Sequence, residues 1–265
     1  MTEWQWETLQ LLQQGHHVCL ATPAGSGRGI ARLLAMYQSL GIDRRGHGLF
    51  IFPHKQRELA QLSTILIWND QLAPEHRLGA EIYDGDTPSS QRRTIRLSVP
   101  QLLLTTPEML HAGILAYHGG WRTLLQGLRY VVVVDVHMCV GALVTHLAHV
   151  LRRLHRLARH YGAQPQYLLT SSPLANPEPI AQALTGRSCM LVTGKTWRRQ
   201  SQSHVLLETN RDLTTIGRAL LERHRAAGLA VVVFEPQRTR LEHAQGAMPH
   251  KYSQSSFSEL PIVTP

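Results

Sequence analysis

A glycine-rich stretch near the N-terminus has residues suited to binding phosphate. Residues 22–29 read Thr-Pro-Ala-Gly-Ser-Gly-Arg-Gly, between a run at 17–21 that predicts a buried strand and a run at 30–36 that predicts a helix. In this arrangement the backbone N–H groups of the turn and of the helix N-terminus point at an anion. The nucleotide-binding form ends in Lys, which reaches the phosphates, and Ser or Thr, which holds Mg²⁺. Arg28 and Gly29 stand there instead, so the loop predicts a phosphate-binding shape without its usual reactive groups.

The elements around this loop alternate between apolar runs and amphipathic segments. The strongest strand is predicted at 130–135, where four consecutive valines indicate burial on both faces, as in the middle of a parallel sheet. Further strands are predicted at 17–21, 49–52, 81–83, 101–105, 166–172, 188–193, 204–208 and 229–234. Helices are predicted at 3–14, 30–36, 56–68, 108–115, 143–161, from Asn176-Pro177 onward, and from Asn210 through Ala227. In the helix at 56–68 we expect Leu59, Leu62, Ile65 and Leu66 to point inward.

This alternation predicts an α/β domain, a mostly parallel sheet with helices on both faces. Ligands of such sheets bind at the carboxyl ends of the strands. The glycine-rich stretch, Pro53, Pro107, the end of the valine strand and Ser171 all fall at such ends.

The composition narrows the classes of partner. Lys+Arg number 27 against 18 Asp+Glu, a net charge of +9, which indicates polyanions, nucleic acid first, or simply an arginine-rich proteome. The three cysteines are far apart in apolar surroundings without C-x-x-C spacing, so we expect inert buried thiols and no metal site. No apolar run approaches the ~20 residues of a membrane span, and we expect a cytoplasmic protein without membrane partners.

The helix predicted at 143–161 has a basic C-terminal half. Its arginines could contact nucleic acid, or could complement the negative end of the helix before Gly162, and the second interpretation is favoured. They are Arg152, Arg153, Arg156 and Arg159.

Several short motifs occur in an order and spacing typical of one family. They are Tyr-Asp-Gly-Asp-Thr-Pro at 83–88, Thr-Thr-Pro-Glu-Met-Leu-His at 105–111, Leu-Arg-Tyr-Val-Val-Val at 128–133, 149–154, 160–162, 175–177 and 184–186. The chain thereby resembles the first RecA-like (P-loop NTPase type) domain of superfamily-two DEAD/DEAH-box helicases. More narrowly, it resembles the DNA helicases related to the yeast RecQ-like repair helicase and its bacterial mitomycin-repair relative. The resemblance implies a helicase ATP-binding domain at 1–198 and a partial second RecA-like domain at 199–245. From Gly246 the composition turns to Ser, Pro, Gln and His, which predicts a flexible tail at 246–265.

The resemblance also implies a site for ATP and Mg²⁺, whose residues can be checked singly. Nucleotide-binding positions are Gln5, at the place of an adenine-contacting glutamine, and Thr22, Gly25, Ser26, Gly27, Arg28 and Gly29. The family's Asp-Glu-Ala-His box, aligned without a gap, places Val134 at the Mg²⁺ aspartate, Asp135 at the catalytic glutamate and His137 at the histidine. A slip of one residue would make Asp135 the metal aspartate. Either alignment leaves one of the two needed carboxylates missing.

The motif that couples the two helicase domains is altered as well. It reads Ser171-Ser172-Pro173, and proline lacks the hydroxyl and N–H of the family's threonine. We expect the arginine fingers of the second domain to lie outside this sequence. The expectation is therefore a degenerate ATP site in a catalytically inactive pseudo-helicase.

The positions that contact nucleic acid in the family match its pattern better than the positions of the ATP site do. The resemblance places a nucleic-acid strand, single- or double-stranded DNA, on Pro53, Lys55, Gly85, Asp86, Thr105, Thr106 and Pro107, with added charge from Arg92 and Arg93. Such contacts go to phosphates and have little sequence specificity. The same stretches could persist because they build the fold. A protein-interaction scaffold with a protein partner, and a residual ATP binder or ATPase, remain as alternatives.

Overall fold

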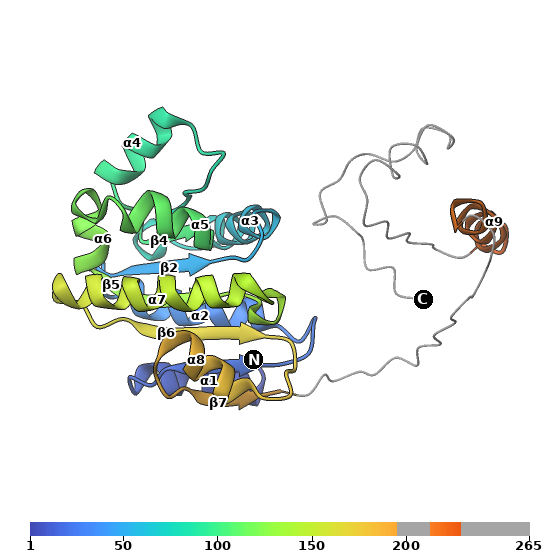
Figure 1. The fold of residues 1–265 in the computed structure, drawn as a ribbon, viewed down its shortest axis with the longest axis horizontal. Helices are drawn as coiled ribbons and strands as arrows, with labels where there is room; N and C mark the ends of the chain where they lie inside the picture. The colour runs from blue at the N-terminus through green and yellow to red at the C-terminus, as the bar shows by residue number, and fades with distance from the viewer. Residues whose placement is uncertain (195–212, 229–265) are drawn as a thin grey trace. The chain divides into compact units, whose positions relative to one another are not determined.

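The computed structural model describes residues 1–194 and 213–228, which belong to two compact units, 1–199 and 200–265. The first unit is built on one seven-stranded sheet of order β3-β4-β2-β5-β6-β1-β7, and every neighbouring pair is parallel (Figure 1). The strands are β1 (Val18–Ala21), β2 (His47–Ile51), β3 (Ala80–Ile82), β4 (Leu102–Thr105), β5 (Leu128–Val133), β6 (Gln166–Ser171) and β7 (Met190–Thr193). The α/β class and the parallel sheet predicted from the sequence are confirmed.

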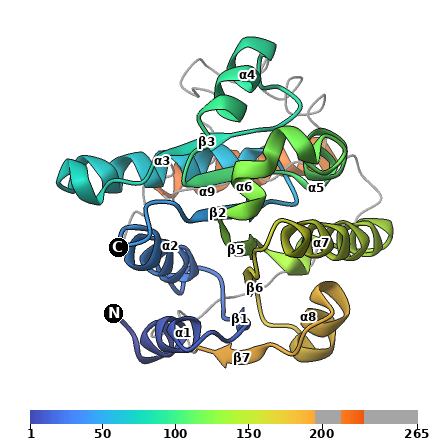
Figure 2. The ribbon, with the colours of Figure 1, turned by 90° about the vertical axis from the view of Figure 1, so that its left-hand side faces the viewer.

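Helices cover both faces of the sheet (Figure 2). One face carries α1 (Glu3–Gln13), α2 (Arg28–Leu40) and α3 (Gln56–Asp70). The other carries α5 (Pro107–Met109), α6 (Arg122–Gln126), α7 (Ala142–His160) and α8 (Pro177–Thr185). Beyond the β3 edge lies α4 (Ser89–Leu97), and the short segments are η1 (Pro74–His76), η2 (Leu110–Leu115), η3 (His118–Trp121) and η4 (Val136–Met138).

The valine run shows how the sequence produces these layers. Successive side chains of a strand point to opposite faces. Val131 and Val133 accordingly pack into the core beneath α7 and α8, and Val132 and Val134 into the core beneath α1 and α2. A strand buried on both faces needs an unbroken apolar run, which is why this one was predictable.

Three local predictions need correction. Leu59 and Leu66 do not point inward: they are 65% and 52% exposed, because α3 buries a narrow face at Glu58, Gln61 and Ile65. The helix predicted at 108–115 is split into α5 and a π-helical turn, η2. The valine strand ends at Val133, and Asp135 takes a left-handed conformation with φ 51°.

The second unit contains one described helix, α9 (Leu213–Ala226), which lies within the helix predicted from Asn210 through Ala227. The strands predicted at 204–208 and 229–234 and the tail at 246–265 lie outside the described residues, so a partial second domain at 199–245 stays a prediction. No helix in the described ranges is both long and apolar enough to span a bilayer.

Candidate functional site

The glycine-rich stretch forms a tight loop between β1 and α2. Gly25 and Gly27 have φ values of 74° and 99°, a region that favours glycine. The Ser26 hydroxyl donates to Thr22 Oγ1 at 2.9 Å, and the Thr22 N–H donates to the Ser171 carbonyl at 3.1 Å. The loop is thus tied to the end of β6, and the first turn of α2 begins at its last residues.

Gln5 is bound to this loop by its side-chain amide. Its Oε1 accepts from the Thr2 N–H at 2.8 Å, and its Nε2 donates to the Gly27 carbonyl at 3.2 Å. A Cβ at Gly27 would lie 2.7 Å from that Nε2, so a larger residue there would displace the Gln5 amide, in addition to being strained at a φ of 99°. Both ends of the Gln5 amide are used inside the protein, at the position where the resemblance implied an adenine contact.

Asp135 forms ion pairs with two arginines from different elements. Arg57 Nη1 lies 2.9 Å from Asp135 Oδ2, and Arg28 Nη2 lies 3.7 Å from Asp135 Oδ1. The Asp135 side chain is only 5% exposed. Arg28 Nη1 is buried and has no hydrogen-bond partner in the described part of the chain. Burial lowers the pKa of Arg28, Asp135 raises it and Arg57 lowers it further.

A third arginine lies behind this pair. Arg32 is 8% exposed and donates from Nη1 to Thr170 Oγ1 at 3.2 Å and from Nη2 to Gln61 Oε1 at 2.8 Å. Burial lowers its pKa to about 10, so it remains charged at neutral pH. Thr170 Oγ1 also accepts from the Asp135 N–H at 3.4 Å. We call Arg28, Arg32 and Arg57 the arginine cluster.

The arginine cluster and Asp135 line one cavity of about 450 Å³ beside the phosphate loop, together with Val134 and Gln61. Three guanidinium groups face one carboxylate, so the cavity has a surplus of positive charge. Sequence reasoning missed Arg32 and Arg57. The i, i+4 spacing of Arg28 and Arg32 could have placed these two on one helix face, whereas nothing local relates Arg57 to Asp135.

His137, two residues after Asp135, contacts one of the coupling serines. His137 Nδ1 accepts from the Ser172 N–H at 3.1 Å, and Nε2 lies 3.3 Å from Ser172 Oγ. Burial lowers the pKa of His137. Asp135 raises it, and the positive charges of Arg28 and Arg57 lower it further. The ring is therefore neutral, with Nε2–H donating to Ser172. Ser171 Oγ is buried and has no hydrogen-bond partner among the described residues.

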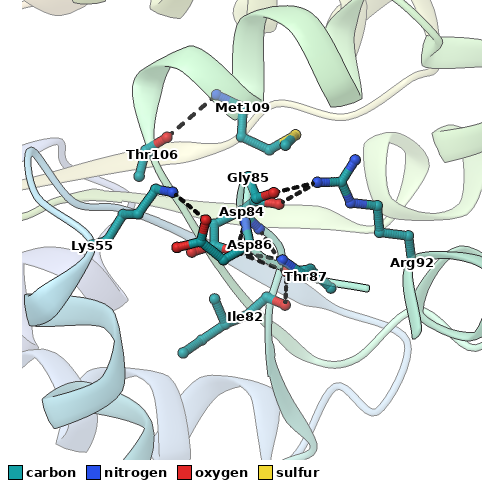
Figure 3. A network of polar contacts seen from close by, with 9 residues as sticks. All are labelled: Lys55, Ile82, Asp84, Gly85, Asp86, Thr87, Arg92, Thr106 and Met109. Carbon is teal, nitrogen blue, oxygen red and sulfur yellow. Dashed lines mark hydrogen bonds and ion pairs between the residues drawn. The ribbon is translucent and has the colours of Figure 1, made fainter. Parts of the chain in front are cut away.

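A second polar network lies at the ends of β3 and β4 (Figure 3). Asp84 Oδ1 accepts from the N–H groups of Asp86 and Thr87, each at 3.0 Å, and from the Thr87 hydroxyl at 2.9 Å. Arg92 Nη2 donates to the carbonyls of Asp84 and Gly85, both at 2.9 Å. Lys55 Nζ pairs with Asp86 Oδ1 at 3.0 Å. We call Lys55, Asp84, Gly85, Asp86, Thr87 and Arg92 the Asp84 network.

The remaining predicted nucleic-acid residues divide into buried and exposed ones. Thr105 is fully buried and donates to the Tyr83 carbonyl at 2.7 Å, and Thr106 caps α5 by accepting from the Met109 N–H at 3.3 Å. Pro107 is buried, Pro53 is half-buried and Arg93 is exposed. Lys55, Gly85 and Asp86 thus lie together at one surface. The Thr105 side chain is buried and contributes to the fold instead of to that surface.

Glu58 lies next to this network and was not predicted. It is 1% exposed, and neither carboxyl oxygen accepts a hydrogen bond in the described part of the chain. Burial raises its pKa to about 8, and the negative charge of Asp84 acts in the same direction against the charge of Lys55. At neutral pH Glu58 is therefore largely protonated.

Within residues 1–194 and 213–228, no group of three His, Cys, Asp or Glu side chains is close enough to hold a metal ion. Cys19, Cys139 and Cys189 are free and buried.

The chain is similar in sequence to two curated helicases. It is 33% identical over 191 residues to the "Uncharacterized ATP-dependent helicase YprA" of Bacillus subtilis, covering 71% of this chain and 25% of that protein. It is 30% identical over 175 residues to "ATP-dependent helicase HRQ1" of Saccharomyces cerevisiae, covering 65% and 16%. The chain thus spans a quarter or less of the length of these two relatives.

Solved structures agree with these similarities. The crystal structure of the DUF1998 helicase MrfA bound to DNA and AMPPNP matches with a TM-score of 0.77 and 28% identity, covering 92% of this chain and 35% of that one. The DEAD-box helicase Mss116 shares the fold alone, at a TM-score of 0.61 and 15% identity. The sheet is therefore that of a RecA-like domain. The family model for DEAD/DEAH box helicases matches residues 2–180, and the chain belongs to the DEAD/DEAH box helicase family.

Proposed function

We propose that this chain is a helicase-family domain that binds nucleic acid and whose nucleotide site does not turn over ATP. The observation that carries the proposal is the arginine pairing of Asp135, which among the described residues is the carboxylate that lines the cavity beside the phosphate loop. A carboxylate held by two guanidinium groups is compensated without a metal ion. The DNA and AMPPNP bound to MrfA support nucleic acid and nucleotide as the ligand classes of the family.

The residues beside the loop do not fit Mg²⁺. The ion needs oxygen ligands and is bound in nucleotide sites by carboxylates together with phosphates. Gly29 offers no hydroxyl, Val134 is apolar and buried, and Asp135 is already paired with Arg28 and Arg57. The surplus positive charge of the arginine cluster would further oppose a divalent cation.

The nucleic-acid strand is proposed to lie against the exposed part of the Asp84 network. Lys55 and Asp86 have side chains that are 46% and 80% exposed, and Gly85 is exposed between Lys55 and Arg92. Lysine ammonium and exposed backbone groups bind phosphates without reading the bases. Thr106 and Pro107 support this surface from within.

Nucleotide titration tests the ATP part of the proposal. Isothermal titration of the full chain with Mg·ATP is expected to give no heat, whereas Arg28→Lys/Gly29→Ser/Val134→Asp/Asp135→Glu is expected to bind because it restores the missing groups. Equal binding of Mg·ATP by both proteins would contradict the proposal and favour the residual ATP binder. Circular dichroism would verify that the variant is folded.

Oligonucleotide binding tests the other part. A fluorescein-labelled 20-nucleotide thymidine strand is expected to bind at low ionic strength and to be released as salt rises, because phosphate contacts release counterions. A duplex of the same length compares the two forms of DNA. Absence of binding to either at low salt would overturn the nucleic-acid function and favour the protein scaffold.

A further inference from the structure

A second basic surface lies on the outward side of α7, away from the phosphate loop. It is a cavity of about 680 Å³ along α7, closed on one side by η2 and on the other by the end of α8. The two views agree that α7 lies between α5 and α8 on this face (Figures 1 and 2). Eight of its eleven lining residues are histidine or arginine, and none is acidic. We call this cavity the α7 groove.

The arginines of the groove are oriented by backbone carbonyls instead of carboxylates. Arg152 Nη2 donates to the Ala183 carbonyl at 3.1 Å, and Arg153 Nη2 donates to the Leu115 carbonyl at 3.0 Å. These carbonyls belong to α8 and η2, so the two arginines do not complement the C-terminus of their own helix. No salt bridge in the described ranges involves them or the other two lining arginines, Arg156 and Arg187. Their charges therefore remain uncompensated.

The histidines add donors next to these charges. The rings of His111 and His146 meet edge to face with centroids 5.3 Å apart, and His155 contacts Arg187. His155 Nδ1 is buried and has no hydrogen-bond partner in the described part of the chain. His149 is exposed on the same stretch of α7. Guanidinium and imidazole groups gathered without a carboxylate form a site for an anion with several oxygens.

The length of the groove selects the kind of anion. Its lining runs along α7 from His146 to Arg156, which is roughly 15 Å at the rise of an α-helix. That length corresponds to about four nucleotides of one strand along the axis of stacked B-form DNA, at 3.4 Å each. A single phosphate would occupy a fraction of it, whereas a nucleic-acid backbone presents the same charge at each step.

We propose that the α7 groove binds the phosphate backbone of a nucleic-acid strand, as a second contact region besides the Asp84 network. This inference rests on the proposed nucleic-acid function. Because α7 begins near the carboxyl edge of the sheet, a strand held at that edge can continue along the helix.

The test compares two variants of the full chain that alter α7. Arg156→Gln/His149→Gln removes two groove side chains, whereas Arg159→Gln removes an exposed charge of the same helix outside the groove. Fluorescence anisotropy with the labelled 20-nucleotide strand is expected to show about 5- to 10-fold weaker binding for the first and less than 2-fold for the second. The slope of log affinity against log salt should fall by about 0.7 with the loss of one arginine contact.

Three outcomes separate the proposals. Equal losses for the two α7 variants, with a larger loss for Lys55→Ala, would overturn the groove and leave the proposed function standing. No binding by the unaltered chain would remove both. Displacement of the strand by poly-glutamate at matched charge concentration would overturn the groove's assignment to nucleic acid and favour an acidic protein segment.

Discussion

The arginine cluster and the Asp84 network lie at the same edge of one sheet, yet their carboxylates have different kinds of partner. In the first, three guanidinium groups gather near a single carboxylate, Asp135. In the second, Asp84 is satisfied by neighbouring N–H and hydroxyl groups, and a second buried acid, Glu58, stays protonated. The arginine cluster gathers surplus positive charge around one buried carboxylate, with Arg57 57% exposed. The Asp84 network contains as many acidic as basic side chains, and its ion pair between Lys55 and Asp86 is exposed.

The two regions therefore differ in which charges are neutralised inside the protein and which are free to bind a ligand. A buried charge that is paired contributes little net stability, but removing its partner is costly. A surface pair is worth less and can be exchanged for a ligand. The arginine cluster is thus expected to matter for folding and the Asp84 network for binding.

The largest expected loss of stability comes from unpairing the arginine cluster. Asp135→Asn should lower the free energy of unfolding by about 3 kcal/mol, because it leaves the largely buried guanidinium groups of Arg28 and Arg32 without their carboxylate. Urea denaturation measures this, and added sulfate should restore part of the loss. The matched control is Asp86→Asn, which breaks a surface pair and should change the free energy of unfolding by about 0.5 kcal/mol. Equal effects would remove the contrast between the two regions.

An effect of opposite sign depends on pH and concerns Glu58. Because the pKa of Glu58 in the folded protein is raised to about 8 from its usual 4.5, its contribution to stability is full below the unfolded pKa and is lost as the pH rises through the folded pKa. Glu58→Gln keeps the size of the neutral acid and cannot ionise. It should match the parent at pH 4 and exceed its free energy of unfolding by about 4 kcal/mol at pH 9.

Denaturation at both pH values, with the exposed Glu75→Gln as control, measures this difference. The control should leave the pH profile of the parent unchanged. A Glu58→Gln variant with the parent's profile would indicate that Glu58 is ionised in the folded protein.

A smaller effect, of opposite sign in two variants, is expected for oligonucleotide binding. Lys55→Ala removes a surface cation and should weaken affinity about 3- to 10-fold, whereas Asp86→Asn frees Lys55 from its 3.0 Å pair and should strengthen it. Anisotropy at two salt concentrations measures both. A loss of affinity in both variants would mean that the pair acts as a unit of structure and not as a phosphate contact.

The smallest effect is expected for the contact between His137 and Ser172. Ser172→Ala removes the hydroxyl that receives Nε2–H and leaves the backbone bond to Nδ1. The free energy of unfolding should fall by about 1 kcal/mol or less, the usual value of one such bond. Thermal denaturation detects this, and a loss as large as that of Asp135→Asn would contradict a peripheral role for this contact.

The sequence predicted the sheet well because its signals are local. The valines at 131–134 and the glycines at 25 and 27 specify a buried strand and a tight turn within a few residues. The partners of Asp135 could not be predicted in this way. Arg57 and Asp135 are nearly eighty residues apart and meet only because β2 and β5 are neighbours. The exposed Leu59 and Leu66 show the same limit, since helical periodicity does not reveal how wide a face its neighbours cover.

The position of β1 has a consequence for how the chain acquires its structure. Val18 pairs with Leu168 on one side and with Met190 on the other, so both neighbours of this strand come at least 150 residues later. During synthesis the apolar β1 segment must wait, without strand partners, until β6 and β7 have left the ribosome. Contacts of such long sequence separation slow folding and expose strand edges to aggregation. A chaperone requirement, or poor yield from fragments that stop before β7, would be its cellular signature.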